Sequence, residues 1–323
     1  MQDFVGKRAV ISGGGSGIGR SLAIQLVSEG CHIAICDLSN QSMAETEDLC
    51  RQANGAVTIS SHQCDVSDEE AVNNFRDQVL EAHGTDYINL VFANAGIGGS
   101  GSFINDERED WERTFGVCWY GVYYTARAFV PLLVASEEGH LINTSSINGF
   151  WASLGPGFPH TAYSAAKFAV KGFSEALVTD LRLNAPHVKV SVVMPGHIGT
   201  NIAINSGKVL GKPEPMDMPV EEVAKLRALM IRRGLPVDNI TDDAIRALIK
   251  QRGEDFRDNA PTKPKQAAEI ILDGVRQDRW RILVGEDAHA IDAQVRATPE
   301  EAYETSFLDQ LHAEGHLGIA DSR

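Results

Sequence analysis

The chain has 323 residues, of which 43% are apolar, 23% charged and 7% aromatic, a composition typical of a globular protein with a large buried core. Its formal net charge of −15 argues against nucleic acid or an anionic membrane as a partner, because both would be repelled. No stretch reaches the roughly 18 apolar residues that a membrane span requires, and residues 1–10 lack the pattern of a secretory signal. These features predict a cytoplasmic protein.

Short β-branched runs alternate along the chain with longer segments of helical period. The runs cover residues 8–12, 32–36, 57–62, 89–94, 140–145 and 189–194. This alternation predicts βαβ units, and the runs are apolar on both faces, as parallel strands covered by helices on each side must be. We therefore expect an α/β fold, a doubly wound parallel sheet of Rossmann type, formed by residues 1–323 as a single domain.

The first run leads directly into a glycine loop, Ser12-Gly13-Gly14-Gly15-Ser16-Gly17-Ile18-Gly19, followed by a helical pattern from near Arg20. Glycines let a pyrophosphate approach the backbone, and the free N–H groups and dipole of a helix N-terminus stabilise its charge. The spacing of the glycines at 13, 17 and 19 is not that of the usual G-x-G-x-x-G fingerprint. A tight turn without a ligand is therefore the alternative.

The second run ends at Asp37, 20 residues after Gly17, where an acidic group would meet the ribose of an adenosine. Its carboxylate would accept hydrogen bonds from the ribose hydroxyls. It would repel a 2′-phosphate, and the next residues, Leu38 and Ser39, supply no cation to offset this. NAD is therefore favoured over NADP. The alternative role for Asp37 is that of a surface aspartate that caps the next helix.

Tyr163 and Lys167 are four residues apart in a helix-forming run, so their side chains share one face. A phenol titrates near about 10, and a neighbouring ammonium lowers its pKa by stabilising the phenolate. The pair therefore suits acid/base chemistry. The alternative is a surface helix, where tyrosine and lysine are common at this spacing.

The five cysteines are odd in number, lack C-x-x-C spacing and lie mostly in apolar stretches: Cys31, Cys36, Cys50, Cys64 and Cys118. We expect buried free thiols in a reducing compartment. The histidines do not cluster with cysteines or carboxylates at ligand spacing, so no metal site is expected.

A long, charged, proline-punctuated region follows residue 200, and we expect residues 201–264 to form a helical lid over a substrate. Its basic residues are Lys208, Lys212, Arg232, Arg233 and Arg252. They form either an anion site or, more simply, solvated helix faces. A helix over residues 266–276 and a strand over 280–284 then complete the sheet, and residues 286–323 form an acidic tail.

The order of these motifs resembles the short-chain dehydrogenase/reductase family from about Gly6 to Thr200. The loop at residues 12–19 is similar to the family's T-G-x-x-x-G-x-G, with serine for threonine. The further matches are Asp65-Val66 to its adenine-contacting pair, Asn94-Ala95-Gly96 to its N-A-G, Ser146 to its catalytic serine, Tyr163 and Lys167 to Y-x-x-x-K, and Pro195-Gly196 with Ile198 and Thr200 to its nicotinamide-side motif.

The resemblance implies an enzyme that moves a hydride between NAD(H) and a secondary alcohol or ketone, here a bulky apolar one. It implies that Tyr163 exchanges a proton with the substrate oxygen, Ser146 hydrogen-bonds that oxygen, and Lys167 binds the nicotinamide ribose. The implied cofactor residues are Gly13, Ser16, Gly17, Ile18, Gly19, Asp37, Asp65, Val66, Asn94, Ala95, Gly96, Tyr163, Lys167, Pro195, Gly196, Ile198 and Thr200. A non-catalytic, NAD-binding regulatory protein is the alternative.

The chain departs from the family pattern at two places. Cys118 stands where the family places an asparagine of its proton relay, either as a space-filling buried thiol or as a reactive one. The segment between Ser146 and Tyr163 is a few residues longer than usual, and residues 150–159 are rich in aromatic residues, glycine and proline. Phe150 and Trp151 in this insert either supply an apolar wall to the substrate cleft or pack against the lid.

The resemblance also implies a homodimer or homotetramer, assembled through the helix that carries Tyr163 and the helix before it. Apolar residues lie around more than one face of the Tyr163 helix: Phe168, Val170, Phe173, Leu177 and Leu181. One face can pack on the sheet, and another needs a partner.

Overall fold

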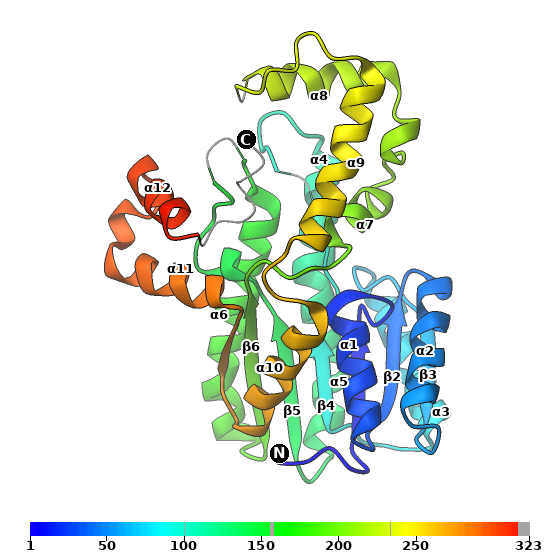
Figure 1. The fold of residues 1–323 in the computed structure, drawn as a ribbon. Helices are drawn as coiled ribbons and strands as arrows, with labels where there is room; N and C mark the ends of the chain where they lie inside the picture. Colours follow the sequence, from blue (N-terminus) through cyan, green and yellow to red (C-terminus); the bar gives the residue numbers. More distant parts are fainter. Residues whose placement is uncertain (100, 156–157, 233, 316–323) are drawn as a thin grey trace.

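The computed structural model describes residues 1–99, 101–155, 158–232 and 234–315, and these are built around one parallel sheet (Figure 1). The seven strands of this sheet lie in the order β3-β2-β1-β4-β5-β6-β7. They are β1 (Arg8–Ser12), β2 (His32–Asp37), β3 (Ile59–Gln63), β4 (Leu90–Ala93), β5 (Gly139–Thr144), β6 (Val188–Pro195) and β7 (Arg281–Val284). The doubly wound sheet predicted from the alternating pattern is confirmed.

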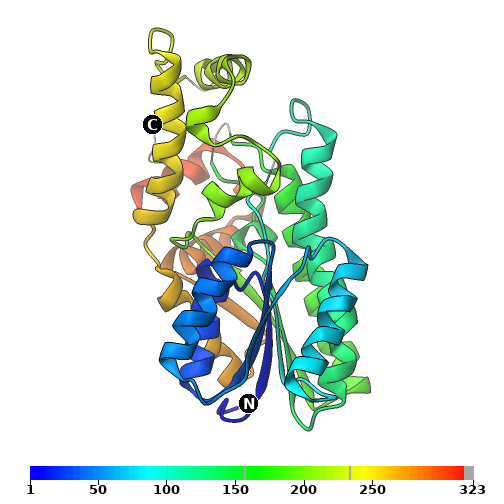
Figure 2. The same cartoon turned by 90° about the vertical axis from the view of Figure 1, so that its right-hand side faces the viewer.

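Helices cover both faces of the sheet, as Figure 2 shows edge-on. One face carries α1 (Gly17–Ser28), α2 (Asn40–Ala53) and α10 (Pro264–Arg276), and the other carries α3 (Glu69–His83), α5 (Gly121–Val134) and α6 (Thr161–Asn184). Successive strand residues point to opposite faces, so Ile11 joins the core beneath α1 whereas Val10 joins the core beneath α5. This double covering explains why the strand runs are apolar throughout.

The strand order reverses direction at β1, whose neighbours are β2 on one side and β4 on the other. In open α/β sheets, the crevice beyond the carboxyl ends of the strands at such a point is the usual ligand site. Helix α4 (Arg108–Phe115) lies on this side and continues through a π-helical turn, η1 (Gly116–Tyr120), into α5.

The region over residues 201–264 is helical, as predicted, and stands above the carboxyl edge of the sheet (Figure 1). It contains α7 (Ile202–Val209), η3 (Pro215–Asp217), α8 (Val220–Arg232) and α9 (Asp242–Asp258). Val223, Met230, Val237 and Ile245 form a small core between α8 and α9. Arg233, one of the predicted basic residues, lies outside the described residues.

The sequence indicated only an acidic tail after residue 285, but much of this segment is folded. It forms α11 (Glu286–Ala297), η4 (Pro299–Glu301) and α12 (Thr305–Ala313), while residues 316–323 lie outside the described part. Its apolar side chains pack on Trp151, which is fully buried and donates from Nε1 to the carbonyl oxygen of Ala302 at 2.7 Å. The C-terminal helices therefore occupy the surface that the insert presents.

Both expectations for Phe150 and Trp151 are wrong. The two rings belong to the cluster with α11 and α12, so they neither line the cleft nor pack against the helices over residues 201–264. Residues 156 and 157 of the same insert lie outside the described residues. All five cysteines are free and buried, as expected. No helix among the described residues is both long and apolar enough to cross a bilayer.

Candidate active site

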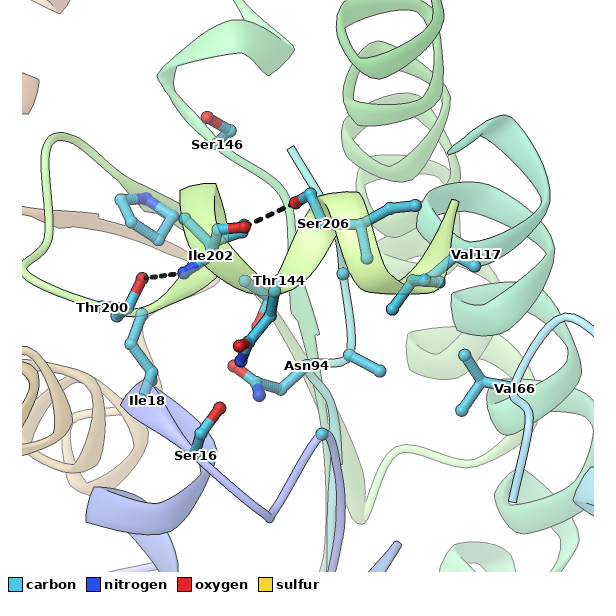
Figure 3. Close-up of a pocket in the computed structure, with 18 of the residues that line it drawn as sticks. Ser16, Ile18, Val66, Asn94, Val117, Thr144, Ser146, Thr200, Ile202 and Ser206 are labelled. Carbon is cyan, nitrogen blue, oxygen red and sulfur yellow. Dashed lines mark hydrogen bonds between the residues drawn. The ribbon is translucent and has the colours of Figure 1, made fainter. Parts of the chain in front are cut away.

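A cleft lies where the strand order reverses, at the carboxyl ends of the strands (Figure 3). It is lined by every predicted site residue except Gly19: Gly13, Ser16, Gly17, Ile18, Asp37, Asp65, Val66, Asn94, Ala95, Gly96, Ser146, Tyr163, Lys167, Pro195, Gly196, Ile198 and Thr200. Gly19 lies behind the loop, where an added Cβ would sit 2.1 Å from the carbonyl oxygen of Gly13. Gly19 is expected to contact the cofactor, but it does not line the cleft. Its lack of a side chain instead allows α1 to pack closely on the loop.

The glycine loop takes the shape that its residues allow. Gly13 and Gly17 have φ values of 69° and 56°, in the left-handed region that favours glycine. Helix α1 begins at Gly17, earlier than the predicted start near Arg20, and the side chain of its N-cap, Ser16, makes no capping hydrogen bond. The first N–H groups of α1 are thus without a side-chain cap at the edge of the cleft, where an anion could accept from them.

Asp37 ends β2 beside this loop. Its Oδ2 accepts from the backbone N–H of Gly15 at 3.0 Å and its Oδ1 from that of Ser39 at 3.2 Å. The cap of α2 is Ser39, whose hydroxyl accepts from Ser42 N–H at 3.2 Å. The alternative in which Asp37 caps the next helix is therefore wrong.

Asp65 lies across the cleft from Asp37 on the loop that follows β3. Its carboxylate forms an ion pair with Arg113 at 2.7 Å and accepts from the hydroxyl of Ser67 at 2.7 Å. Burial alone would raise the pKa of Asp65, but the hydrogen bonds from Arg113 and Ser67 outweigh it and hold the pKa below its usual value. Arg113 is an orienting partner that the sequence motif does not contain.

Ser146, Tyr163 and Lys167 are brought together by β5 and α6. Ser146 follows the end of β5, and its hydroxyl lies close enough to that of Tyr163 on α6 to lower the pKa of the phenol. The neighbouring Ser145 ties the strand to the helix by donating to the carbonyl oxygen of Lys167 at 2.8 Å. Lys167 Nζ donates to the carbonyl oxygen of Thr144 at 2.9 Å and lies 5.4 Å from the centroid of the Tyr163 ring.

The pKa of Tyr163 is shifted opposite to the expected direction. Burial raises it, and the neighbouring hydroxyl of Ser146 only partly opposes this. Burial also lowers the pKa of Lys167. The ammonium is directed to the Thr144 carbonyl oxygen rather than to the phenol, so it does not offset the cost of burying a phenolate. The tyrosine is therefore a protonated phenol at neutral pH.

His160 stands next to Tyr163, and the motif analysis did not single it out. It is the N-cap of α6, three residues before Tyr163, and the two ring centroids are 4.6 Å apart. Burial lowers the pKa of His160 to about 4, so the imidazole is neutral at pH 7. Its place one turn before the tyrosine is the sequence signal that could have identified it.

Cys118 lies in the π-helical turn η1 and is completely buried. Its thiol donates to the carbonyl oxygen of Ile97 at 3.3 Å. A Cβ placed on Gly96 would lie 3.6 Å from Lys167 Nζ and 3.9 Å from Cys118 Sγ, so the thiol and the ammonium flank the same glycine. The predicted burial of this cysteine is confirmed.

The loop after β6 is held by residues far away in sequence. The backbone N–H of His197 donates to Asp287 Oδ2 on α11 at 2.6 Å, and His197 Nε2 lies 2.7 Å from the carbonyl oxygen of Phe256 on α9. A Cβ on Gly196 would come within 2.2 Å of Asp287, so only glycine fits there. The C-terminal helices thus position the loop that borders the cleft.

Helix α7 crosses the cleft and presents one face to it (Figure 3). The lining residues Ile202, Asn205, Ser206 and Val209 follow the helical period. Ser206 Oγ donates to the carbonyl oxygen of Ile202 at 2.5 Å and accepts from the N–H of Gly98 at 2.7 Å, which joins α7 to the loop after β4. Sequence reasoning missed these residues because no motif of the resemblance reaches beyond Thr200.

The remaining lining residues that the sequence did not identify are mostly apolar: Leu38, Cys64, Ile97, Val117, Thr144, Ser145 and Phe256. They come from six separate loops and helices, so only the fold brings them together. Within the described ranges, no group of three or more His, Cys, Asp or Glu side chains is placed to hold a metal ion.

A family model described as short chain dehydrogenase matches residues 7–209. The chain belongs to the short-chain dehydrogenase/reductase family. It is therefore an oxidoreductase, and the matched segment carries the glycine loop, Ser146, Tyr163, Lys167 and the loop after β6.

Relatives and solved structures of this family extend the match over most of the chain. SadH of Mycobacterium tuberculosis, named as an oxidoreductase, is 35% identical over 298 residues, which are 92% of this chain and 92% of SadH. Human epidermal retinol dehydrogenase 2 is 31% identical over 202 residues, 62% of this chain and 63% of that protein. A family member from Burkholderia phymatum, solved in complex with NAD, is 29% identical with a TM-score of 0.73, covering 93% of this chain and 95% of that one.

Proposed function

We propose that the chain moves a hydride between NAD(H) and the carbinol carbon of a secondary alcohol or its ketone. The observation that carries this proposal is that the neighbouring hydroxyls of Ser146 and Tyr163 line the same cleft as the uncapped N-terminus of α1 and the carboxylate of Asp37. The non-catalytic alternative has no comparable observation in its favour.

The residues of the cleft fit a dinucleotide. The N–H groups at the start of α1 suit a pyrophosphate, and the carboxylate of Asp37 suits the hydroxyls of an adenosine ribose. Asp65, held ionised by Arg113, suits the adenine side, and Ile198 and Thr200 suit the nicotinamide side. When bound, the nicotinamide supplies or accepts the hydride.

The specificity for NAD rests on charge. Asp37 lines the cleft near the glycine loop, where its charge would repel a 2′-phosphate, and its neighbours Leu38 and Ser39 are uncharged. The relative from Burkholderia phymatum, solved with NAD, supports the same preference. We therefore assign NAD rather than NADP.

Tyr163 acts as the acid in reduction and the base in oxidation. Because its phenol is protonated at neutral pH, it can donate to a carbonyl oxygen as negative charge develops there. Ser146 holds the same oxygen by a hydrogen bond, since its hydroxyl already lies against that of Tyr163. Lys167 binds the nicotinamide ribose and, once redirected from the Thr144 carbonyl oxygen, stabilises the phenolate formed on proton transfer.

The substrate is bulky and largely apolar. Ile97, Val117, Val209 and Phe256 supply apolar surface to the cleft, and residues 201–264 cover it as a lid. The relative named epidermal retinol dehydrogenase 2 supports an alcohol as the class of substrate.

We further propose a homodimer or homotetramer assembled through α5 and α6, where Tyr120, at the end of η1 just before α5, and Phe168 on α6 are 43% and 42% exposed. The five buried free thiols support a reducing, cytoplasmic location.

A substrate panel tests the proposed reaction. The wild-type chain is incubated with NAD and a benzylic, an alicyclic or a long-chain secondary alcohol, and in the reverse direction with NADH and the matching ketones, while NADH absorbance is followed. We expect turnover of at least one pair. NAD binding without turnover of any member would favour the regulatory alternative.

A further inference from the structure

Nearly all basic residues of the lid have an acidic partner or lie in solvent. On α9 itself, Arg246 pairs with Asp243 at 2.7 Å, Lys250 with Glu254 at 3.5 Å and Arg257 with Asp258 at 2.7 Å. Elsewhere in the lid, Lys208 pairs with Glu214, Lys212 with Asp110 and Arg227 with Asp242, while Lys225 and Arg232 are exposed. For Lys208, Lys212 and Arg232, the interpretation as solvated helix faces holds.

Arg252 is different. It is half-buried, its Nε is buried without a hydrogen-bond partner, and no carboxylate among the described residues forms an ion pair with it. Burial lowers the pKa of Arg252, and no acidic group raises it again, whereas Asp258 raises the pKa of the neighbouring Arg257. A half-buried guanidinium without a counter-ion is unfavourable, and an anion that supplied the missing acceptors would relieve it.

The position of Arg252 places it on the inner face of α9. Ile245, Ile249, Arg252 and Phe256 follow one another at helical spacing, so they form one stripe. Ile245 is fully buried at one end of this stripe, and Phe256 lines the cleft at the other. Arg252 therefore lies one turn, roughly 6 Å along the axis, from a residue of the cleft.

Phe256 also connects this stripe of α9 to the loop after β6, which borders the nicotinamide side of the cleft. Its ring lies 4.3 Å from that of His197, and its carbonyl oxygen lies 2.7 Å from His197 Nε2. Phe256 lines the cleft whereas Arg252, one turn before it on α9, does not. A substrate that reaches it extends from the nicotinamide end of the cleft into the lid.

We propose that Arg252 binds an anionic group, a carboxylate, at the end of the substrate remote from its carbinol carbon. The substrate class is then an apolar secondary alcohol or ketone that ends in a carboxylate. This inference rests on the proposed function, because it assigns the far end of the same substrate. Guanidinium and carboxylate form two parallel hydrogen bonds, which matches the partners that Arg252 lacks.

The overall charge of the chain sharpens this assignment. At a formal net charge of −15, the surface as a whole repels anions, so an anionic substrate needs a local cation that no acidic side chain neutralises. Among the described lid residues, Arg252 is the half-buried cation that meets this condition.

A matched pair of substrates tests the assignment. Para-(α-hydroxyethyl)phenylpropionate and the corresponding phenylpropionamide have the same shape and differ in charge. We expect kcat/KM of the wild type to be about tenfold or more higher for the acid, mostly through a lower KM, as expected for a hydrogen-bonded charge pair. Arg252→Met should bring the ratio near one and leave kcat/KM for the amide within about twofold.

Two further variants control the comparison. Lys250→Met removes a cation paired with Glu254 on the same helix and should leave the preference for the acid unchanged. Arg252→Lys keeps the charge but loses the two parallel hydrogen bonds, so it should retain part of the preference, and it serves if Arg252→Met folds poorly. The proposal is overturned if the wild type does not prefer the acid, or if Arg252→Met and Arg252→Lys both keep the full preference.

A binding measurement separates this proposal from the proposed reaction. If no alcohol is turned over, calorimetry is performed on the chain with NADH, using para-ethylphenylpropionate and its amide as probes. Tighter binding of the carboxylate that Arg252→Met abolishes supports the anion site even though the reaction is wrong. Equal binding of the two probes, or a preference that survives in Arg252→Met, rejects the anion site.

Discussion

Cys118 occupies the position at which this chain departs from its family, and its packing decides what a substitution there does. The thiol is completely buried and donates to the Ile97 carbonyl oxygen at 3.3 Å, so no space is left for a larger amide. Cys118→Asn would bury unsatisfied polar groups at a cost of about 1–3 kcal/mol. We expect the melting temperature and the activity to fall together.

Cys118→Ala is the matched control, because it removes the thiol without adding polar groups. It should keep most of kcat at a slightly lower melting temperature. An increase in activity for Cys118→Asn at unchanged melting temperature would instead show that the site accepts the amide of the family's relay. Loss of catalysis in Cys118→Ala, with NAD binding unchanged, would reveal a chemical role for the thiol.

We assign the preference for NAD over NADP to Asp37. Replacing it by alanine removes the charge that opposes a 2′-phosphate, and Leu38→Arg, at a partly exposed position of the cleft wall, supplies a cation in its place. The double variant should therefore shift the ratio of kcat/KM from NAD toward NADP, while Leu38→Arg alone should shift it less. A wild-type chain that already prefers NADP would contradict the assignment.

The motifs singled out Tyr163, which lines the cleft, but could not predict the direction of its pKa shift. The i and i+4 spacing puts the phenol and the ammonium on one face, which favours a lowered pKa. The structure directs Lys167 to the carbonyl oxygen of Thr144 and buries the phenol, and both effects depend on how β5 meets α6. Spacing along one helix does not contain that information.

At the scale of elements, the sheet was predictable and the supports of the site were not. Each β-branched run is a strand with bounds within two residues, because double-sided burial leaves a local pattern. The contact between Trp151 and Phe307, at 5.8 Å between ring centroids, joins segments far apart in sequence. Such a contact leaves no local pattern in the sequence. The two C-terminal helices therefore emerged only from the structure.

Asp287 is the residue through which α11 acts on the site. Asp287→Ala removes the acceptor of the His197 N–H and should lower the free energy of unfolding by about 1–3 kcal/mol, and it should weaken NAD binding because the loop after β6 loses its support. Asp287→Asn retains an acceptor oxygen and should preserve NAD affinity. Denaturant unfolding and NAD titration measure the two effects.

The pH dependence of these variants follows from the pKa of Asp287, which burial raises although N–H donors of His197 and Ala288 oppose it. A raised folded pKa means that the carboxyl group stabilises the fold most below its unfolded pKa of about 3.9 and loses this contribution as the pH rises through the folded value. Asparagine does not titrate. The stability of Asp287→Asn relative to the wild type should therefore improve as the pH rises from about 4 to 7, and a gap that is constant or moves the other way would contradict the assignment.

At the scale of the whole molecule, the doubly wound parallel sheet follows from the alternating pattern, whereas the order of its strands and the face that the lid turns to the cleft do not. Residues 201–264 read as charged helices, but which side of α7 and α9 faces the cleft depends on contacts such as Ser206 with Gly98. The sequence likewise does not show which aromatic rings of α6 and η1 are exposed, namely Phe168 and Tyr120. Their burial in an assembly is what the family resemblance implies, and in the single chain these rings are partly exposed.

Light scattering tests the proposed assembly. At micromolar concentration we expect a mass of two or four chains, and Phe168→Glu should reduce it, because it places a charge in the contact. Val5→Glu is the matched control, since Val5 is an apolar residue 70% exposed in the segment before β1. A wild-type chain of monomeric mass would exclude this interface.

The central claim is that Tyr163 transfers the proton that accompanies hydride transfer in this cleft. The most direct test compares the rate of NADH formation in wild type and Tyr163→Phe, using an active alcohol from the panel, with NAD affinity measured in the same preparations. We predict that the rate falls by about 10²–10⁴-fold while the Kd for NAD changes by no more than about twofold, because only the transferable proton is removed. A variant that binds NAD normally and keeps most of the wild-type rate would contradict the account.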